Sequence, residues 1–103
     1  MKKYNKLVRD KIPEIMLASG AKPVTKTLND KEYTLYLEKK LDEEVAEYHR
    51  DKNLEELADI LEVVYALCEN LGHSVDELSA VYSKKHNARG GFTKRIFLIG
   101  DEQ

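Results

Sequence analysis

The stretch LDEEVAEYHRDKNLEELAD, residues 41–59, decides the fold of this chain. It holds two pairs of carboxylates three residues apart, Glu44 with Glu47 and Glu56 with Asp59. Residues three apart share one face of a helix, so each pair can direct two acids at one point. Only residues 50–53 separate the two helical segments, and so short a connection predicts antiparallel neighbours. The four carboxylates are therefore expected to meet across a helical hairpin.

Helix signals extend outward from this hairpin in both directions. Three Asn or Ser residues precede a glutamate by three positions, a capping-box pattern, and the helices they open reach about residues 49, 70 and 89. Gly72 suits the end of the second helix, and Gly90 with Gly91 the end of the third. Apolar residues recur every three or four positions in each helix. The capping pairs are Asn29 with Glu32, Asn53 with Glu56, and Ser74 with Glu77.

The two ends of the chain are less regular. Residues 10–17 predict a short helix that tolerates Pro13 in its first turn and closes at Ser19 and Gly20. Residues 21–28 predict a loop or a short extended piece. Residues 92–99 are mostly apolar and predict either a short strand or an extended tail that docks on the bundle or on a partner. The expected fold class is all-α, a small antiparallel helical bundle.

Length and composition limit what this chain can be. Its 103 residues predict one domain, residues 1–103, with so little buried surface that a homodimer or higher homo-oligomer is expected. No apolar run reaches the ~18 residues that span a membrane, and the basic N-terminus lacks the apolar stretch of a signal peptide. Cys68 has no second cysteine to pair with and is expected to pack in a helix face. These features favour a cytoplasmic protein without a membrane partner.

Charge is strongly segregated along the chain. Residues 30–69 hold thirteen acids and five bases, a net charge of −8. Residues 84–95 hold five bases and no acid, and residues 1–11 hold five bases and one acid. The simpler interpretation is that these charges lie on solvated helix faces and at the ends of the chain. The more specific interpretation is that the acids form a metal site and that the two basic segments fold over a bound polyanion. Nucleic acid is not expected as a partner, because its phosphates would meet the acidic middle.

Oxygen ligands without histidine or cysteine favour a hard cation, so Mg²⁺ is the expected metal, with Mn²⁺ as an alternative. Each acid also has a simpler explanation. Glu56 could complete a helix cap, the helix dipole favours Asp59 in a first turn, and Glu44 and Glu47 could pair with Lys39 or Lys40. Acids near the end of the first long helix oppose its dipole, however, and capping does not explain them. Zinc-site spacings and phosphate-binding glycine loops are absent.

Residues 43–59, with Glu43-Glu44-x-x-Glu47 followed by Glu56-x-x-Asp59, resemble the signature of the all-α nucleoside triphosphate pyrophosphohydrolases. This group includes MazG-like proteins, dimeric dUTPase-like enzymes and phosphoribosyl-ATP pyrophosphohydrolase. The segments YNKLVRDKIP, residues 4–13, and RGGFTKRIFL, residues 89–98, resemble a small phosphoribosyl-ATP pyrophosphohydrolase-like branch. The connection between Glu47 and Glu56 is shorter than in many relatives.

The resemblance implies Mg²⁺-dependent cleavage of a nucleoside triphosphate or phosphoribosyl nucleotide between the α and β phosphates, giving a monophosphate and pyrophosphate. It implies that Glu44, Glu47, Glu56 and Asp59 bind the metal and that Glu43 orients or deprotonates the attacking water. It also implies that Lys85 and Arg89 meet phosphates, and their i, i+4 spacing places both on one helix face. Further phosphate-binding candidates are Lys6, Arg9, Lys94 and Arg95. The alternative is a non-catalytic helical module that binds nucleotides or proteins.

Overall fold

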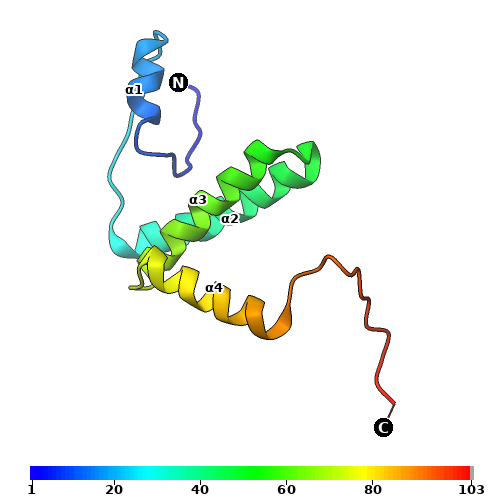
Figure 1. The fold of residues 1–103 in the computed structure, drawn as a ribbon. Helices are drawn as coiled ribbons and strands as arrows, with labels where there is room; N and C mark the ends of the chain where they lie inside the picture. Colours follow the sequence, from blue (N-terminus) through cyan, green and yellow to red (C-terminus); the bar gives the residue numbers. More distant parts are fainter. Residues whose placement is uncertain (103) are drawn as a thin grey trace.

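A computed structural model describes residues 1–102 and contains four helices and no strand within that range. They are α1 (Ile12–Ala18), α2 (Asp30–Asp51), α3 (Leu54–Asn70) and α4 (Val75–Arg89). The all-α prediction is confirmed. Figure 1 shows α2 and α3 lying side by side as an antiparallel hairpin, with α1 at one side and α4 diverging from the end of α3. None of the helices in the described range is long and apolar enough to cross a membrane.

Local sequence signals account for the helix ends. The Asn29 side chain accepts a hydrogen bond from the Glu32 amide, and the Glu32 carboxylate accepts one from the Asn29 amide, as the capping box predicts. Ser74 and Glu77 form the same reciprocal box at α4. Two residues, Lys52 and Asn53, connect α2 to α3, and Lys52 adopts a left-handed backbone with φ of +48°. The hairpin is tight because so short a turn holds the two helices together.

The box at α3 is only half formed, which corrects the prediction. Asn53 accepts a hydrogen bond from the Glu56 amide at 3.0 Å. The Glu56 carboxylate does not return a bond to Asn53 and lies instead with the acids of α2. A capping role therefore does not explain this glutamate.

The hydrophobic core is small. Within the described range, the buried apolar residues are Leu37 on α2 and Val63 and Cys68 on α3. Cys68 packs as predicted, and its thiol donates a hydrogen bond to the Ser74 carbonyl at 3.3 Å. The α3 apolar stripe has the predicted period, but Leu57 and Leu61 are each 47% exposed, because α4 covers only the far end of α3. Much of the apolar surface thus remains uncovered in the single chain.

The C-terminal segment does not form the strand that was one of its two predicted conformations. Residues 92–99 form no strand and extend away from α4 as a tail (Figure 1). The tail does not pack on the bundle of the same chain, since Phe97 is 86% exposed, and docking on a partner stays a prediction. Gly90, with φ of +79°, ends α4 and turns the chain outward. The N-terminal segment behaves differently, because it returns to the hairpin and contacts its acidic side chains.

Candidate metal centre

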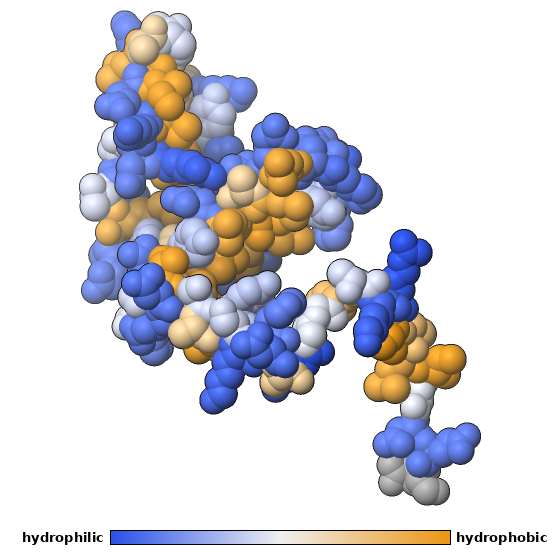
Figure 2. All heavy atoms as spheres, in the orientation of Figure 1, coloured by the Kyte–Doolittle hydropathy of each residue, from blue (hydrophilic) through white to orange (hydrophobic). Residues whose placement is uncertain are grey.

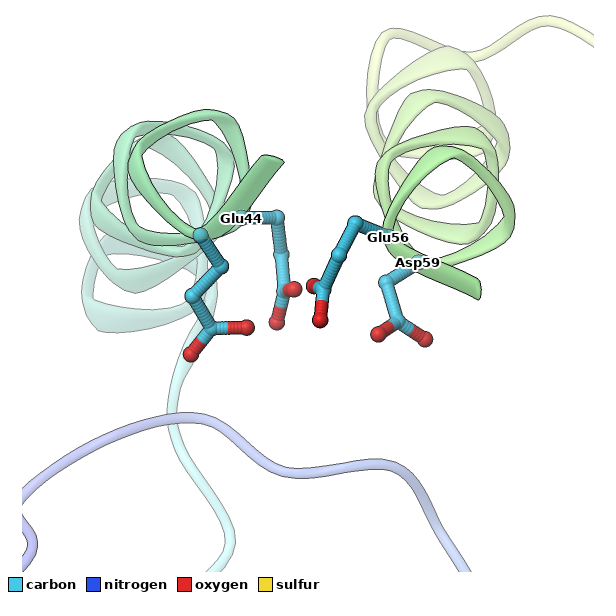
Figure 3. Close-up of side chains that lie close together, drawn as sticks. Glu44, Glu56 and Asp59 are labelled. Carbon is cyan, nitrogen blue, oxygen red and sulfur yellow. The ribbon is translucent and has the colours of Figure 1, made fainter. Parts of the chain in front are cut away.

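The hairpin brings four carboxylates into one cluster. Glu44 and Glu47 come from α2, Glu56 and Asp59 come from α3, and one oxygen of each lies within 4.8 Å of the other three. Figure 3 shows Glu44 reaching from one helix toward Glu56 and Asp59 of the other. The i, i+3 spacing aligns each pair, and the antiparallel turn brings the pairs to the same level. Together these four residues form the acidic cluster.

Glu44 is the most constrained member of the acidic cluster. It is 6% exposed, and it is the buried charged residue of the described range. Lys40 lies with its Nζ 3.3 Å from Glu44 Oε1, so one oxygen has a cation beside it. The other oxygen, Oε2, is buried and has no hydrogen-bond partner, and Oε2 of Glu56 is in the same state. A buried acceptor without a partner is unfavourable, and a bound cation would satisfy both oxygens.

The pKa shifts of the acidic cluster also favour a bound cation. Burial raises the pKa of the Glu44 carboxyl above its ordinary value, the nearby Glu47 carboxylate raises it further, and Lys40 opposes the shift. Burial also raises the pKa of Glu56, with added contributions from the negative charges of Glu47, Asp51 and Asp59. Charge is therefore disfavoured on both residues whose oxygens lack partners. These are the conditions that a divalent cation relieves.

The donor set fits a hard cation. All four donors are carboxylate oxygens, the ligands that Mg²⁺ and Mn²⁺ prefer. Opposite oxygens around Mg²⁺ lie about 4.2 Å apart, twice its ~2.1 Å bond length. The largest separation in the acidic cluster, 4.8 Å, therefore exceeds this span by only a few tenths of an ångström. The four oxygens are therefore near enough to one another to be offered to one ion.

Two basic residues of the N-terminal segment, Lys6 and Arg9, contact acidic side chains of the hairpin, and their predicted role in phosphate binding stays a prediction. Arg9 Nη2 is 2.7 Å from Asp59 Oδ1, and Lys6 Nζ is 3.3 Å from Glu43 Oε1. A hollow of about 260 Å³ lies between this segment and the hairpin, lined by Arg9, Asp10, Tyr33, Lys40, Glu44 and Asp59 among others. Glu44 and Asp59 are the two members of the acidic cluster that line this hollow, and Arg9 and Lys40 are the cations beside them.

Glu43 lies beside the acidic cluster and does not belong to it. Its carboxylate pairs with Lys6 at 3.3 Å and with Lys40 at 3.4 Å. Lys40 therefore bridges Glu43 and Glu44. In the sequence, Lys40 is expected only as an ion-pair partner that could replace a metal. Its i, i+4 spacing from Glu44 is the sequence signal for the ion pair that the structure shows. The pair leaves Glu44 Oε2 without a partner, so Lys40 neutralises the acidic cluster only in part.

The basic residues near the C-terminus lie elsewhere in this chain. Lys85 and Arg89 are exposed on α4, which diverges from the hairpin (Figure 1), and neither lines the hollow at the acidic cluster. Arg89, Lys94 and Arg95 border a separate hollow at the start of the tail, together with Phe92 and Ile96. Within one chain, the cations beside the acidic cluster come from α2 and from the N-terminal segment.

Comparison with known proteins adds one relative. A segment of 41 residues, 40% of this chain, is 63% identical to an uncharacterized protein of Mycolicibacterium smegmatis. The match covers 42% of the length of that relative. No family model matches the chain. No solved structure matches it either.

Proposed function

We propose that this chain is a Mg²⁺-dependent nucleotide pyrophosphohydrolase built on a MazG-like helical bundle, acting on a nucleoside triphosphate or a phosphoribosyl nucleotide. One observation carries the proposal: four carboxylate oxygens gather within 4.8 Å, and two of these residues have a buried oxygen without a partner. The motif resemblance at residues 43–59 supplies the reaction type. A hydrolase of this kind would act in the cytoplasm, where a lone thiol such as Cys68 stays reduced.

The cations around the acidic cluster support a polyphosphate substrate. Lys6, Arg9 and Lys40 each contact a carboxylate of the acidic cluster or the neighbouring carboxylate of Glu43. In the absence of substrate these contacts offset the negative charge. A triphosphate entering the hollow would offer stronger acceptors, because guanidinium binds phosphate oxygens through paired hydrogen bonds. Arg9 would then exchange Asp59 for phosphate and leave that carboxylate to the metal.

The proposed reaction is hydrolysis. A bond forms between a water oxygen and the α phosphorus, the bond from that phosphorus to the bridging oxygen breaks, and pyrophosphate leaves. When bound, Mg²⁺ neutralises phosphate charge and lowers the pKa of a coordinated water. Glu44, Glu47, Glu56 and Asp59 would hold it. Glu43, held by Lys6 and Lys40, would orient the water and accept its proton.

Pyrophosphate release from a panel of nucleotides with Mg²⁺ tests the proposal. Glu47→Gln and Asp59→Asn remove one ligand charge each and are expected to lower kcat/KM at least 100-fold. Glu38→Gln removes an exposed acid from α2 outside the acidic cluster and is expected to leave kcat/KM unchanged. Calorimetric titration with Mn²⁺ separates the alternatives. Wild type that binds Mn²⁺ and hydrolyses no nucleotide would be a non-catalytic module, and wild type that binds no divalent ion would overturn the metal centre itself.

A further inference from the structure

The hollow beside the acidic cluster continues along the hairpin, away from the four carboxylates. Two contacts fix the register of α2 against α3. Glu44 meets Asp59 in the acidic cluster, and the Asn70 side-chain amide donates a hydrogen bond to the Thr34 hydroxyl at 3.0 Å. In this register the lining residues of the two helices lie at matching levels, Glu44 with Asp59, Lys40 with Val63, Leu37 with Ala66 and Tyr33 with Glu69. The rise from Glu44 back to Tyr33 is about 16 Å along α2.

The chemistry of the lining changes along this length. The end at the acidic cluster is charged, with carboxylates beside Arg9 and Lys40. The middle is apolar, because Leu37 is buried and Ala66 has a small side chain that leaves room. Apolar residues also gather along the hairpin surface in Figure 2. Such an apolar space, with a few polar groups at its ends, is typical of small-molecule sites.

The far end of the hollow combines a tyrosine with a carboxylate. The other acids of the lining are nearer the acidic cluster, because Glu62 is one turn from Asp59 and Asp10 follows Arg9. Glu69 is therefore the acid that lies level with Tyr33. A carboxylate at this distance from the acidic cluster is too far away to share its metal ion, whose bonds are about 2.1 Å long.

Neither residue at the far end is engaged within the described part of the chain. Tyr36 and Tyr82 each contact a neighbouring cation or ring, whereas the half-buried Tyr33 has no such contact and its hydroxyl makes no hydrogen bond. Glu77 pairs with His73, whereas the Glu69 carboxylate pairs with no cation and accepts no hydrogen bond. An aromatic ring and an acceptor are thus both available to a ligand in the hollow.

We propose that the far end of the hollow binds the base of the nucleotide and selects bases that carry an amino group. This inference rests on the proposed function, since it assumes that the phosphates lie at the acidic cluster. Tyr33 stacks on the base, and stacking on an aromatic ring tolerates any base. Glu69 supplies the selection, because an ionised carboxylate only accepts hydrogen bonds.

The amino groups of cytosine and adenine donate hydrogen bonds, and a glutamate can accept one of them. Uracil and hypoxanthine carry an oxo group in the same position, and this oxygen would face the Glu69 carboxylate as a second acceptor. Nucleotides of uracil or hypoxanthine are therefore expected to bind more weakly. The hollow of about 260 Å³ is close to the lower size limit of small-molecule pockets, so it suits a base with its sugar.

Calorimetric titration with α,β-methylene analogues in Mn²⁺ tests the selection without hydrolysis, because a carbon replaces the oxygen that bridges the α and β phosphates. Two matched pairs differ only by amino against oxo: the analogues of CTP and UTP, and those of ATP and ITP. In a pair that binds, the amino member is expected to bind about tenfold more tightly or better. Wild type with equal or reversed affinities within the pairs, or with no affinity for any of the four analogues, would overturn the proposal.

Glu69→Gln should abolish the preference, because an amide can both donate and accept, and the affinity ratio within a pair should approach one. Glu69 is exposed, so the variant should keep the helical circular dichroism of wild type. Glu55→Gln is the matched control, because Glu55 is an exposed acid of α3 outside the hollow and should keep the preference. A Glu69→Gln variant that keeps the wild-type ratio would contradict the role of this carboxylate.

Tyr33→Leu should weaken binding of all analogues at least fivefold without changing the ratio within a pair, and Tyr33→Phe, which keeps the ring, should bind as wild type does. Tyr82→Leu, on α4 outside the hollow, is the control. Pyrophosphate release from CTP and ATP separates the two proposals. Selective binding of the amino analogues without release would reject the proposed reaction and retain the base site, whereas release with equal kcat/KM within both pairs would retain the reaction and reject the base site.

Discussion

Arg9 and Asp59 meet through a 2.7 Å contact between Nη2 and Oδ1, although fifty positions separate them in the sequence. The contact ties the N-terminal segment to the start of α3 and places a cation at the acidic cluster. Asp59 is 39% exposed and Arg9 is 51% exposed at their side chains, so water reaches the pair. An exposed pair contributes little stability and exchanges partners easily. The Arg9–Asp59 pair is therefore expected to affect ligand binding more than the stability of the fold.

Arg9→Gln should separate metal binding from substrate binding. Without the guanidinium, Asp59 is free for the cation, so the Mn²⁺ dissociation constant is expected to fall two- to fivefold. The KM for a triphosphate should rise about tenfold or more, since a charged phosphate contact is lost. Calorimetry and pyrophosphate release measure the two effects. Lys26→Gln, which removes a cation paired with Glu32, should change neither. Weaker Mn²⁺ binding in Arg9→Gln would show that Arg9 supports the metal centre instead of competing with it.

Glu44→Gln should change stability in opposite directions with and without metal. In EDTA the substitution removes a poorly compensated buried charge and should raise Tm by a few degrees. With millimolar Mn²⁺ the wild type gains stability by mass action, whereas the variant gains little. Thermal unfolding by circular dichroism in both buffers measures this, with Glu38→Gln as the control. A variant that is less stable than wild type in EDTA would mean that Lys40 already satisfies Glu44.

The same residues predict how pH acts on the metal-free chain. The pKa of Glu44 and of Glu56 is raised in the folded state, so folding favours their protonated forms. Their destabilising effect is absent below the pKa of the unfolded chain and grows as pH rises through the raised value. Mn²⁺ competes with these protons, so its dissociation constant should increase as pH falls from 7 toward the ordinary glutamate pKa of 4.5. Titration at several pH values checks this, and Glu44→Gln should flatten the dependence.

Glu77 should stabilise α4 in a pH-dependent manner with the opposite sign. Contacts with His73 at 3.0 Å and with the Ser74 amide at 3.0 Å lower the pKa of Glu77 to about 2. Its stabilisation is therefore complete above the ordinary glutamate pKa of 4.5 and is lost as pH falls through about 2. Glu77→Gln should lower Tm at pH 7, and the difference from wild type should shrink toward pH 2. Asp76→Asn, one residue earlier, is the control, and an equal loss of Tm in both variants would contradict a role specific to Glu77.

Leu37 should dominate the stability of the hairpin. It is 1% exposed, so Leu37→Ala leaves a cavity between α2 and α3 and should cost about 2–5 kcal/mol in the free energy of unfolding. Leu35→Ala, at a position 52% exposed, should cost less than about 0.5 kcal/mol. Urea unfolding measures both. Equal effects of the two substitutions would contradict the observed packing.

The sequence by itself determined the helices and their ends. The capping box of Asn29 and Glu32 and the i, i+3 spacing of the acids operate within one helical turn, so they can be read without knowing what packs where. The convergence of Glu44, Glu47, Glu56 and Asp59 was also predictable, because a short turn leaves an antiparallel hairpin little freedom.

Only the tertiary structure decided which of these groups are buried, paired or left open. In the structure, Arg9 contacts Asp59. Lys40 pairs with one oxygen of Glu44, and the other oxygen has no hydrogen-bond partner. Val63 is buried in the core, whereas Leu57 and Leu61 are half exposed. The tertiary structure also set α4 and residues 92–99 away from the hollow at the acidic cluster. Helix periodicity fixes which face a residue occupies. Burial and charge compensation depend on which distant segment covers that face, and local spacing does not encode this.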